Sequence, residues 1–233
     1  FILQFICAFF IPDSPVDIAR RAHKNKKEEQ DKAEKEKTLK RHSLFQKCYI
    51  KPMIIGISLA AFQQFAGVNA LVSNMSPLLN KSGLTIDSAY QAAITTSAEV
   101  FAGYISTAIM DKVGRRLIWM ISGAGACFFM ILFSTNLIIN WSSILPVISI
   151  FCYMFLFGGG FAPIPWIIVP EMFDDDVRST ANSICVSINW LCASIVTFCF
   201  PYMEASMQMH GALYFFAACC FCAVIFGFIF IPA

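Results

Sequence analysis

Three amide side chains, Gln63, Gln64 and Asn69, interrupt the apolar stretch "SLAAFQQFAGVNALV" at residues 58–72. A primary amide both donates and accepts hydrogen bonds, which suits a ligand covered in hydroxyl groups. The alternative is hydrogen bonding between helices, worth about 1 kcal/mol per contact. Gln64 and Asn69 would lie about 140° apart on an ideal helix, but a bend at Gly67 would turn all three amides toward one cavity. Three amides so close together favour a ligand site.

A second unusual stretch, "FGGGFAPIPWIIVPE" at residues 157–171, predicts a discontinuous helix. Pro163 and Pro165 interrupt an α-helix because each proline lacks a backbone donor and clashes with the preceding turn. Inside a membrane, the freed backbone groups must be buried in protein or line a cavity. Trp166 follows the break, and Trp190 lies near the middle of a later apolar segment. An indole ring stacks well on a sugar, although core packing is an even alternative for Trp190.

Glu99 is the one carboxylate well inside a predicted membrane span. A charged residue there costs about 2.5–3.5 kcal/mol on insertion scales, so it should face water, ligand or a partner. Three roles stay open: binding substrate, binding a proton, or remaining protonated and hydrogen-bonded. An enzyme is disfavoured, because no histidine or metal-ligand spacing accompanies Glu99. The ten cysteines fit small, buried, reduced thiols, and no cofactor or metal is expected.

The composition predicts an all-α membrane protein. The 233 residues are 58% hydrophobic and 14% charged, with a mean hydropathy of +0.65, whereas soluble domains carry about 25% charged residues. The net charge of +2 does not indicate a nucleic-acid partner. Residues 1–11 are too short to span a bilayer, so we expect the end of a helix there. Six segments have spanning length: 52–73, 89–110, 117–139, 145–169, 180–202 and 211–231.

The positions of the basic residues predict which loops share a side of the membrane. Alternate loops, at 13–51, 111–116 and 170–180, contain 16 of the 17 lysines and arginines. The positive-inside rule makes these three segments cytoplasmic. Trp119 and Trp141, near the two ends of the third span, are expected to be interfacial anchors.

Several motifs together resemble the sugar porters of the major facilitator superfamily, which include glucose and insect facilitated trehalose transporters. "QQFAGVN" is similar to the Q-Q-x-[SA]-G-x-N of the family's seventh helix, and "DKVGRR" to its [DE]-[RK]-x-G-R-R loop. "APIPWIIVPEMF", followed by Arg178 and "NW", is similar to the run of helices ten and eleven. The resemblance covers almost the whole chain, in the family's order and spacing.

The resemblance implies that the chain corresponds to the C-terminal half of a twelve-helix fold. Residues 1–12 would end helix six, 13–51 would form a cytoplasmic charged helical domain, and 52–233 would form a six-helix bundle. The substrate contacts would come from Gln63, Gln64, Asn69, Glu99, Trp166 and Trp190. A cytoplasmic charge network that opens and closes during transport would comprise Asp111, Arg115, Arg116, Glu171 and Arg178. The expected partners are a small-molecule sugar, the lipid bilayer and an N-terminal half that is missing here.

The sequence departs from the family pattern at several positions. Ser73 and Asn74 stand where the family usually has two aromatic residues, and Glu99 stands where many glucose facilitators carry asparagine. Gly158 replaces a glutamate of helix ten. The expected function is facilitative transport of a hexose such as glucose, or of trehalose, by alternating access in the plasma membrane. The chain looks incomplete and inactive alone; the alternative is a sugar-binding receptor or regulatory half-transporter that does not transport.

Overall fold

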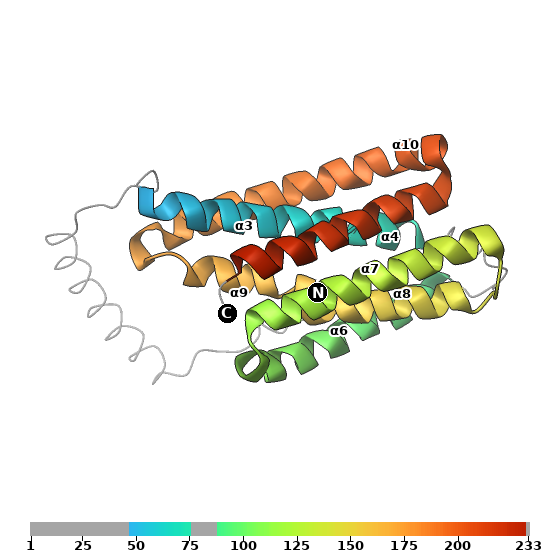
Figure 1. The fold of residues 1–233 in the computed structure, drawn as a ribbon, viewed down its shortest axis with the longest axis horizontal. Coiled ribbons are helices and arrows are strands. Elements are labelled where there is room, and N and C mark those ends of the chain that lie inside the picture. Colours follow the sequence, from blue (N-terminus) through green and yellow to red (C-terminus); the bar gives the residue numbers. More distant parts are fainter. Residues whose placement is uncertain (1–46, 76–87, 232–233) are drawn as a thin grey trace, which may run out of the picture. The chain divides into compact units, whose positions relative to one another are not determined.

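The computed structural model describes residues 47–75 and 88–231, and all regular structure in these ranges is helical. This confirms the all-α fold class. The expected features at 1–12, most of the charged segment 13–51, and Lys81 lie outside the described residues. The helices are α3 (Lys47–Phe65), α4 (Val68–Ser73), α6 (Ser88–Val113), α7 (Arg115–Ile139), α8 (Leu145–Leu156), the π-helix η1 (Phe157–Phe161), α9 (Ile164–Glu171) and α10 (Asp175–Phe230) (Figure 1).

Within the described residues, four helical stretches are long and apolar enough to cross a membrane, so the protein is an integral, multi-pass membrane protein. They are Cys48–Ser73, Arg115–Ile139, Leu145–Glu171 and Asp175–Phe230. The last contains 56 residues, but Gln208 has the non-helical angles φ 60° and ψ 170°. Figure 1 shows α10 as two antiparallel arms on either side of this break. Although α6 has 26 residues, it is not among the four stretches, and the count of six spans stays a prediction.

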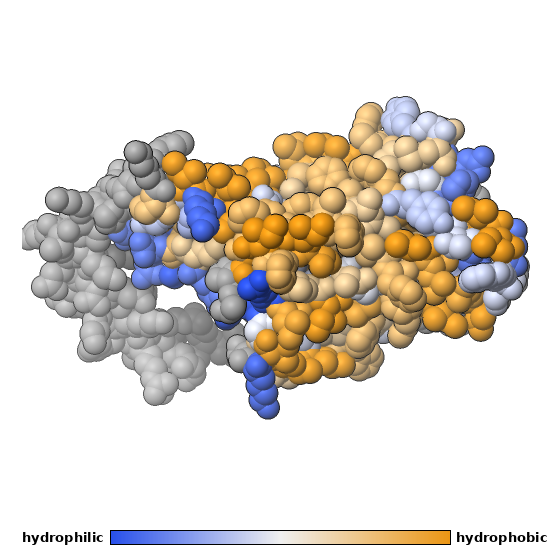
Figure 2. All heavy atoms as spheres, viewed as in Figure 1, coloured by the Kyte–Doolittle hydropathy of each residue, from blue (hydrophilic) through white to orange (hydrophobic). Residues whose placement is uncertain are grey.

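The helices are apolar on both their inner and outer faces. Leu59 of α3, Tyr153 of α8 and Phe216 of α10 are almost fully buried in one apolar core. In contrast, 76% of Tyr104 and 69% of Phe198 is exposed, although both are large aromatic side chains. Figure 2 shows apolar residues over most of the visible helical surface and polar residues mainly toward the helix ends. A helix that is apolar all round is typical of a membrane span, because its outer face contacts lipid.

Trp119 is not an interfacial anchor, so that expectation is wrong. Its side chain is fully buried, and its indole Nε1 donates to the carbonyl of Ala223 at 2.9 Å. The ring centroid lies 4.3 Å from that of Phe161. The buried indole N–H therefore has a partner inside the bundle, where no interfacial water is needed. Trp141 is 67% exposed in the connection between α7 and α8.

The first membrane stretch is interrupted between α3 and α4, at Ala66 and Gly67. Gly67 has φ 87°, a left-handed conformation that side chains with a Cβ rarely adopt. The buried Tyr153 hydroxyl, from α8, donates a hydrogen bond to the carbonyl of Ala66 at 2.8 Å. A freed backbone group inside the bundle thus has a polar partner, as the absence of water requires.

The second interruption is the π-helix between α8 and α9, where two side chains replace missing helical hydrogen bonds. The Ser122 hydroxyl accepts from the N–H of Phe161 at 3.1 Å and donates to the carbonyl of Leu156 at 2.5 Å. It therefore lies between two groups of the helical ladder, a recognised cause of helix distortion. Pro165 has no N–H to offer the carbonyl four residues earlier, at Phe161. Gln63 Nε2 supplies that donor, at 2.9 Å.

Candidate functional site

The amides of α3 and α4 form one continuous chain of hydrogen bonds with Asn189 of α10. Asn69 Nδ2 donates to Gln64 Oε1 at 2.5 Å, and Gln64 Nε2 donates to Asn189 Oδ1 at 2.9 Å. Asn189 Nδ2 in turn donates to Gln63 Oε1 at 2.6 Å and to the carbonyl of Ala60 at 3.1 Å. Gln63, Gln64 and Asn189 are all buried. The break at Gly67 thus brings the three predicted amides together.

The members of this amide chain differ in how much hydrogen-bonding capacity they retain. Gln63 uses both N–H groups, on the carbonyls of Phe161 and Ala162 at 2.9 Å each, and Asn189 uses both of its own. Gln64 and Asn69 each use one of their two N–H groups. Asn69 is also only half-buried. Gln64 and Asn69 are therefore the amides of this network that still have an N–H donor for a hydroxyl group.

Both predicted tryptophans have exposed rings, but Trp190, although it follows Asn189 in α10, is not among the described residues that line the crevice beside this network. Trp166 is 42% exposed and Trp190 is 63% exposed. Trp166 lines a crevice of about 10 Å³ together with Gln63 and Asn189, between α3, α9 and α10. A space of this size holds about one water molecule. A larger polar ligand would therefore contact the open side of the crevice, beside the exposed ring of Trp166.

Glu99 of α6 lies directly against the π-helix, at Gly158. A Cβ atom on Gly158 would lie 2.8 Å from Glu99 Cγ and 2.7 Å from the Glu99 carbonyl oxygen. The side chain of Glu99 is half-buried and has no hydrogen bond or ion pair to the described residues. Gly158 therefore allows the close approach of α6 that places this carboxylate beside the interrupted helix.

Replacing Gly158 with alanine is expected to lower the free energy of unfolding by about 1–3 kcal/mol, the usual cost of overpacking. The new methyl group would meet the Glu99 backbone, which moves less easily than a flexible side chain. Gly159→Ala is the matched control, because its nearest neighbour would be Ala102 Cβ at an ordinary 3.9 Å. Denaturant unfolding in detergent micelles measures both variants. Equal losses at the two positions would contradict the close contact.

The predicted charge network is only partly assembled. Arg115 Nη2 at the start of α7 pairs with Glu171 Oε1 at the end of α9, at 2.7 Å. Arg116 instead donates to the Phe228 carbonyl and lies 4.9 Å above the Phe228 ring centroid. Arg178 pairs within its own helix, with Asp175 at 2.6 Å. The side chain of Asp111 is not among those the structure describes.

Three residues that form side-chain hydrogen bonds between helices were not predicted from the sequence. Asn189 connects Gln63 to Gln64, and its place beside Trp190 in an apolar segment was a signal that could have found it. Asp174 accepts a hydrogen bond from the Tyr49 hydroxyl at 2.6 Å, which connects the beginnings of α10 and α3. Neither Tyr49 nor Asp174 belongs to a pattern that indicates this contact. Within the described ranges, no three histidine, cysteine or carboxylate side chains lie close enough to hold a metal ion.

Among known proteins, insect trehalose transporters are similar to this chain in sequence. The chain is 30% identical over 198 residues to the facilitated trehalose transporter Tret1 of Bombyx mori, a match that covers 81% of this chain and 39% of that protein. The trehalose transporter Tret1-1 of Drosophila simulans is also 30% identical, with 81% and 23% covered. The chain thus spans well under half the length of these relatives.

The fold is similar to solved structures of major facilitator proteins. The inward-open xylose transporter XylE from E. coli matches with a TM-score of 0.73 at 22% identity, over 99% of this chain and 51% of that chain. A family model described as "Sugar (and other) transporter" matches residues 1–233, in agreement with the resemblance of the motifs. The chain therefore belongs to the sugar transporter family, whose members are transporters and not enzymes.

Proposed function

We propose that this chain forms one wall of a facilitative sugar transport pathway, which alternates between inward-open and outward-open states. The observation that carries the proposal is the unused N–H donors of Gln64 and Asn69, in a network that borders the exposed ring of Trp166. Trp190, the residue after Asn189, is also exposed. Amides bind sugar hydroxyls, and indole faces stack on sugar rings. The substrate is a hexose such as glucose, or trehalose, and trehalose is the sugar that the names of the relatives give.

In this proposal, the two glutamines have different roles. Gln64 and Asn69 hydrogen-bond the sugar, whereas Gln63 mainly supports the interrupted helix through the carbonyls of Phe161 and Ala162. Any movement of that helix changes the position of Gln63, and Asn189 transmits the change to Gln64. Sugar binding and the shape of the helix break are thereby coupled.

Glu99 provides a carboxylate from α6 in place of the one that family members carry on helix ten. On the resemblance to the family motif, that glutamate would stand at the position of Gly158. Glu99 Cγ lies next to the position where a Gly158 side chain would begin. The carboxylate therefore reaches nearly the same region from the neighbouring helix. We propose that it accepts hydrogen bonds from the sugar. Proton binding by Glu99 is the competing role.

The ion pair of Arg115 with Glu171 forms part of a cytoplasmic gate in the proposed cycle. Both side chains are about half-exposed, so the pair contributes little stability and can separate at low cost. Segments 13–51, 111–116 and 170–180 lie in the cytoplasm, and the membrane is the plasma membrane. An N-terminal half completes the pathway. A receptor function is not favoured, because the relatives are named as transporters.

The test combines sugar binding with sugar uptake. Purified chain, reconstituted in lipid vesicles, is titrated with glucose and trehalose while tryptophan fluorescence is recorded, and uptake of labelled sugars follows. Asn69→Ala is expected to weaken sugar binding by about five- to tenfold, because it removes one hydrogen bond to the ligand. Asn74→Ala is the matched control, because this amide donates only to the Ala70 carbonyl. Unchanged affinity in Asn69→Ala would contradict the ligand assignment. Saturable uptake would establish a carrier, and binding without uptake would favour either a receptor or a chain that needs its N-terminal half.

A further inference from the structure

A groove separate from the amide network lies between the beginning of α3 and the last turns of α10. Its volume is about 510 Å³, and its lining consists of Ile50, Lys51, Ile54, Ile55, Phe226 and Phe230. The two helices pack against each other, and Figure 1 shows the start of α3 and the final arm of α10 at the same end of the bundle. Among the described residues of this lining, Lys51 is the only polar one.

The lysine is placed near the membrane surface, whereas the rest of the lining reaches inward. The apolar stretch that contains α3 begins at Cys48, so Lys51 lies only about one helical turn inside it. Ile54 and Ile55 follow one turn deeper along α3. A lysine in this position extends its ammonium group toward the surface while its hydrocarbon stem stays against the apolar wall.

The charge of Lys51 is available to a ligand. Its side chain is exposed and has no hydrogen bond or ion pair to the described residues. The carboxylate of Asp174, which approaches this end of α3, already accepts a hydrogen bond from Tyr49. Arg116 of α7 lies above the Phe228 ring near the end of α10, but it is not among the described residues that line the groove. The groove therefore combines an apolar wall with one lysine that has no ion pair to the described residues.

We propose that this groove binds one anionic phospholipid from the membrane, with an acyl chain against Ile54 and Phe226 and the phosphate group at Lys51. Basic groups between membrane helices at the bilayer surface attract anionic headgroups. The apolar lining supplies van der Waals contacts to the acyl chain. The lipid would hold the start of α3 against the end of α10, at the opposite end of α3 from the break at Gly67.

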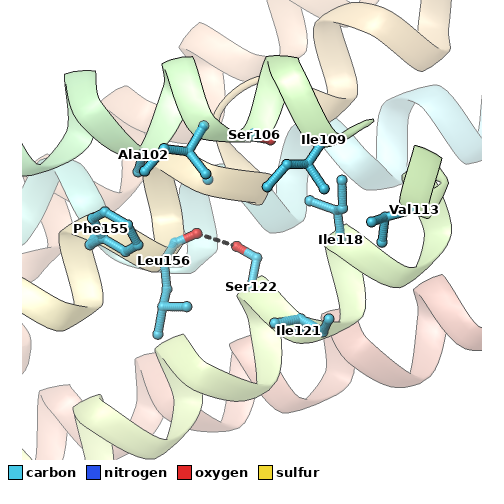
Figure 3. Close-up of a pocket in the computed structure, with 11 residues that line it drawn as sticks. Ala102, Ser106, Ile109, Val113, Ile118, Ile121, Ser122, Phe155 and Leu156 are labelled. Carbon is cyan, nitrogen blue, oxygen red and sulfur yellow. Dashed lines mark hydrogen bonds between the residues drawn. The ribbon is translucent and has the colours of Figure 1, made fainter. Parts of the chain in front are cut away.

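A second apolar groove provides the comparison, because it lacks a cation. It lies between α6, α7 and the end of α8, has a volume of about 230 Å³, and includes Ile109, Ile121 and Leu156 in its lining (Figure 3). Ser106 and Ser122 are its polar residues; Ser122 is bonded to the Leu156 carbonyl, and the buried Ser106 hydroxyl has no partner in the described chain. Neither hydroxyl carries charge, so this groove is not expected to distinguish anionic from zwitterionic lipids.

The experiment measures lipid retention by native mass spectrometry. The purified, delipidated chain in detergent is titrated with phosphatidylglycerol and with phosphatidylcholine of identical acyl chains. The first bound phosphatidylglycerol is expected to be retained about fivefold more tightly than phosphatidylcholine, the preference that one lysine near an anionic headgroup provides. Lys51→Gln is expected to bring the ratio close to one. Lys112→Gln, which removes an exposed lysine that lines neither groove, should leave the ratio unchanged.

Tryptophan substitutions that fill each groove distinguish lipid binding at the Lys51 groove from general contact with lipid. Ile54→Trp is expected to weaken retention of both lipids, whereas Ile109→Trp in the uncharged groove should preserve the preference for phosphatidylglycerol. Both isoleucines are partly exposed, at 57% and 41%, so a larger side chain is tolerated at each position. The proposal is overturned if the wild-type chain shows no preference, if Lys112→Gln abolishes the preference as Lys51→Gln does, or if Ile54→Trp retains lipid as the wild type does.

Discussion

Replacing Gly67 with alanine is expected to lower the free energy of unfolding by about 2–5 kcal/mol. Two costs combine. The backbone of Gly67 has φ 87°, where a side chain costs about 1–2 kcal/mol. The new Cβ would also lie 2.6 Å from the ring of Phe216, which is almost fully buried, and overpacking of this kind costs about 1–3 kcal/mol. Unfolding of the purified chain by a denaturing detergent measures the loss.

Gly103→Ala is the matched control for this prediction. Gly103 lies inside α6, and its nearest neighbour would be the Gly158 carbonyl oxygen at 4.0 Å. The substitution should leave stability unchanged or raise it by up to about 1 kcal/mol, because alanine is the better helix former. Adding Phe216→Leu to Gly67→Ala should recover part of the loss by relieving the contact. If the double variant is no more stable than Gly67→Ala, the whole loss of stability comes from the backbone conformation. If Gly67→Ala is as stable as the wild type, both causes are contradicted.

The positions of the two helix breaks could be predicted from the sequence, but their supports could not. Glycine and proline have local effects on the backbone, so Gly67 and Pro165 indicated where regular α-helix would end. The partner side chains come from other helices. Nothing in the sequence around Ser122 indicates that its hydroxyl lies between the Leu156 carbonyl and the Phe161 N–H. Tyr153 donates to the Ala66 carbonyl, but in the sequence it is not distinguished from the other aromatic residues of an apolar helix.

The error at Trp119 has a similar origin. Its position near the end of an apolar segment is typical of an interfacial residue, and the sequence does not show which face of α7 is turned inward. The Ala223 carbonyl, 104 residues later in the chain, provides the partner that allows the indole to be buried. The local pattern predicted an interfacial tryptophan, but packing against a distant part of the chain buries Trp119.

The residues of the amide network could be predicted from the sequence, but the hydrogen bonds that connect them could not. Gln63, Gln64 and Asn69 lie in one network, which the unusual density of amides had indicated. The order of contacts depends on Asn189, a residue 120 positions beyond Asn69, and could not be read from spacing along one helix. For the same reason, the sequence did not show that Arg116 and Arg178 would use other partners than Glu171.

Replacing Asn189 with leucine is expected to destabilise the protein and also to weaken sugar binding. Asn189 is buried and makes three hydrogen bonds through its amide. Leucine has a similar size but leaves Gln63 Oε1 and a Gln64 N–H without these partners in the bundle. An unpaired buried group costs about 1–3 kcal/mol, so the loss of unfolding free energy should be about 2–5 kcal/mol. Denaturant unfolding and the fluorescence titration measure the two effects.

Asn182→Leu separates this connecting role from a general effect of removing an amide. Asn182 lies two turns earlier in α10 and lines the same crevice, but it makes no hydrogen bond to the described residues. Its replacement should leave sugar affinity unchanged, whereas Asn189→Leu, measured where it remains folded, should bind sugar about tenfold more weakly because Gln64 loses its fixed orientation. A folded Asn189→Leu variant with wild-type affinity would limit Asn189 to a structural role. Reduced affinity in Asn189→Leu alone would mean that the orientation of the sugar-binding amides depends on contacts across three helices.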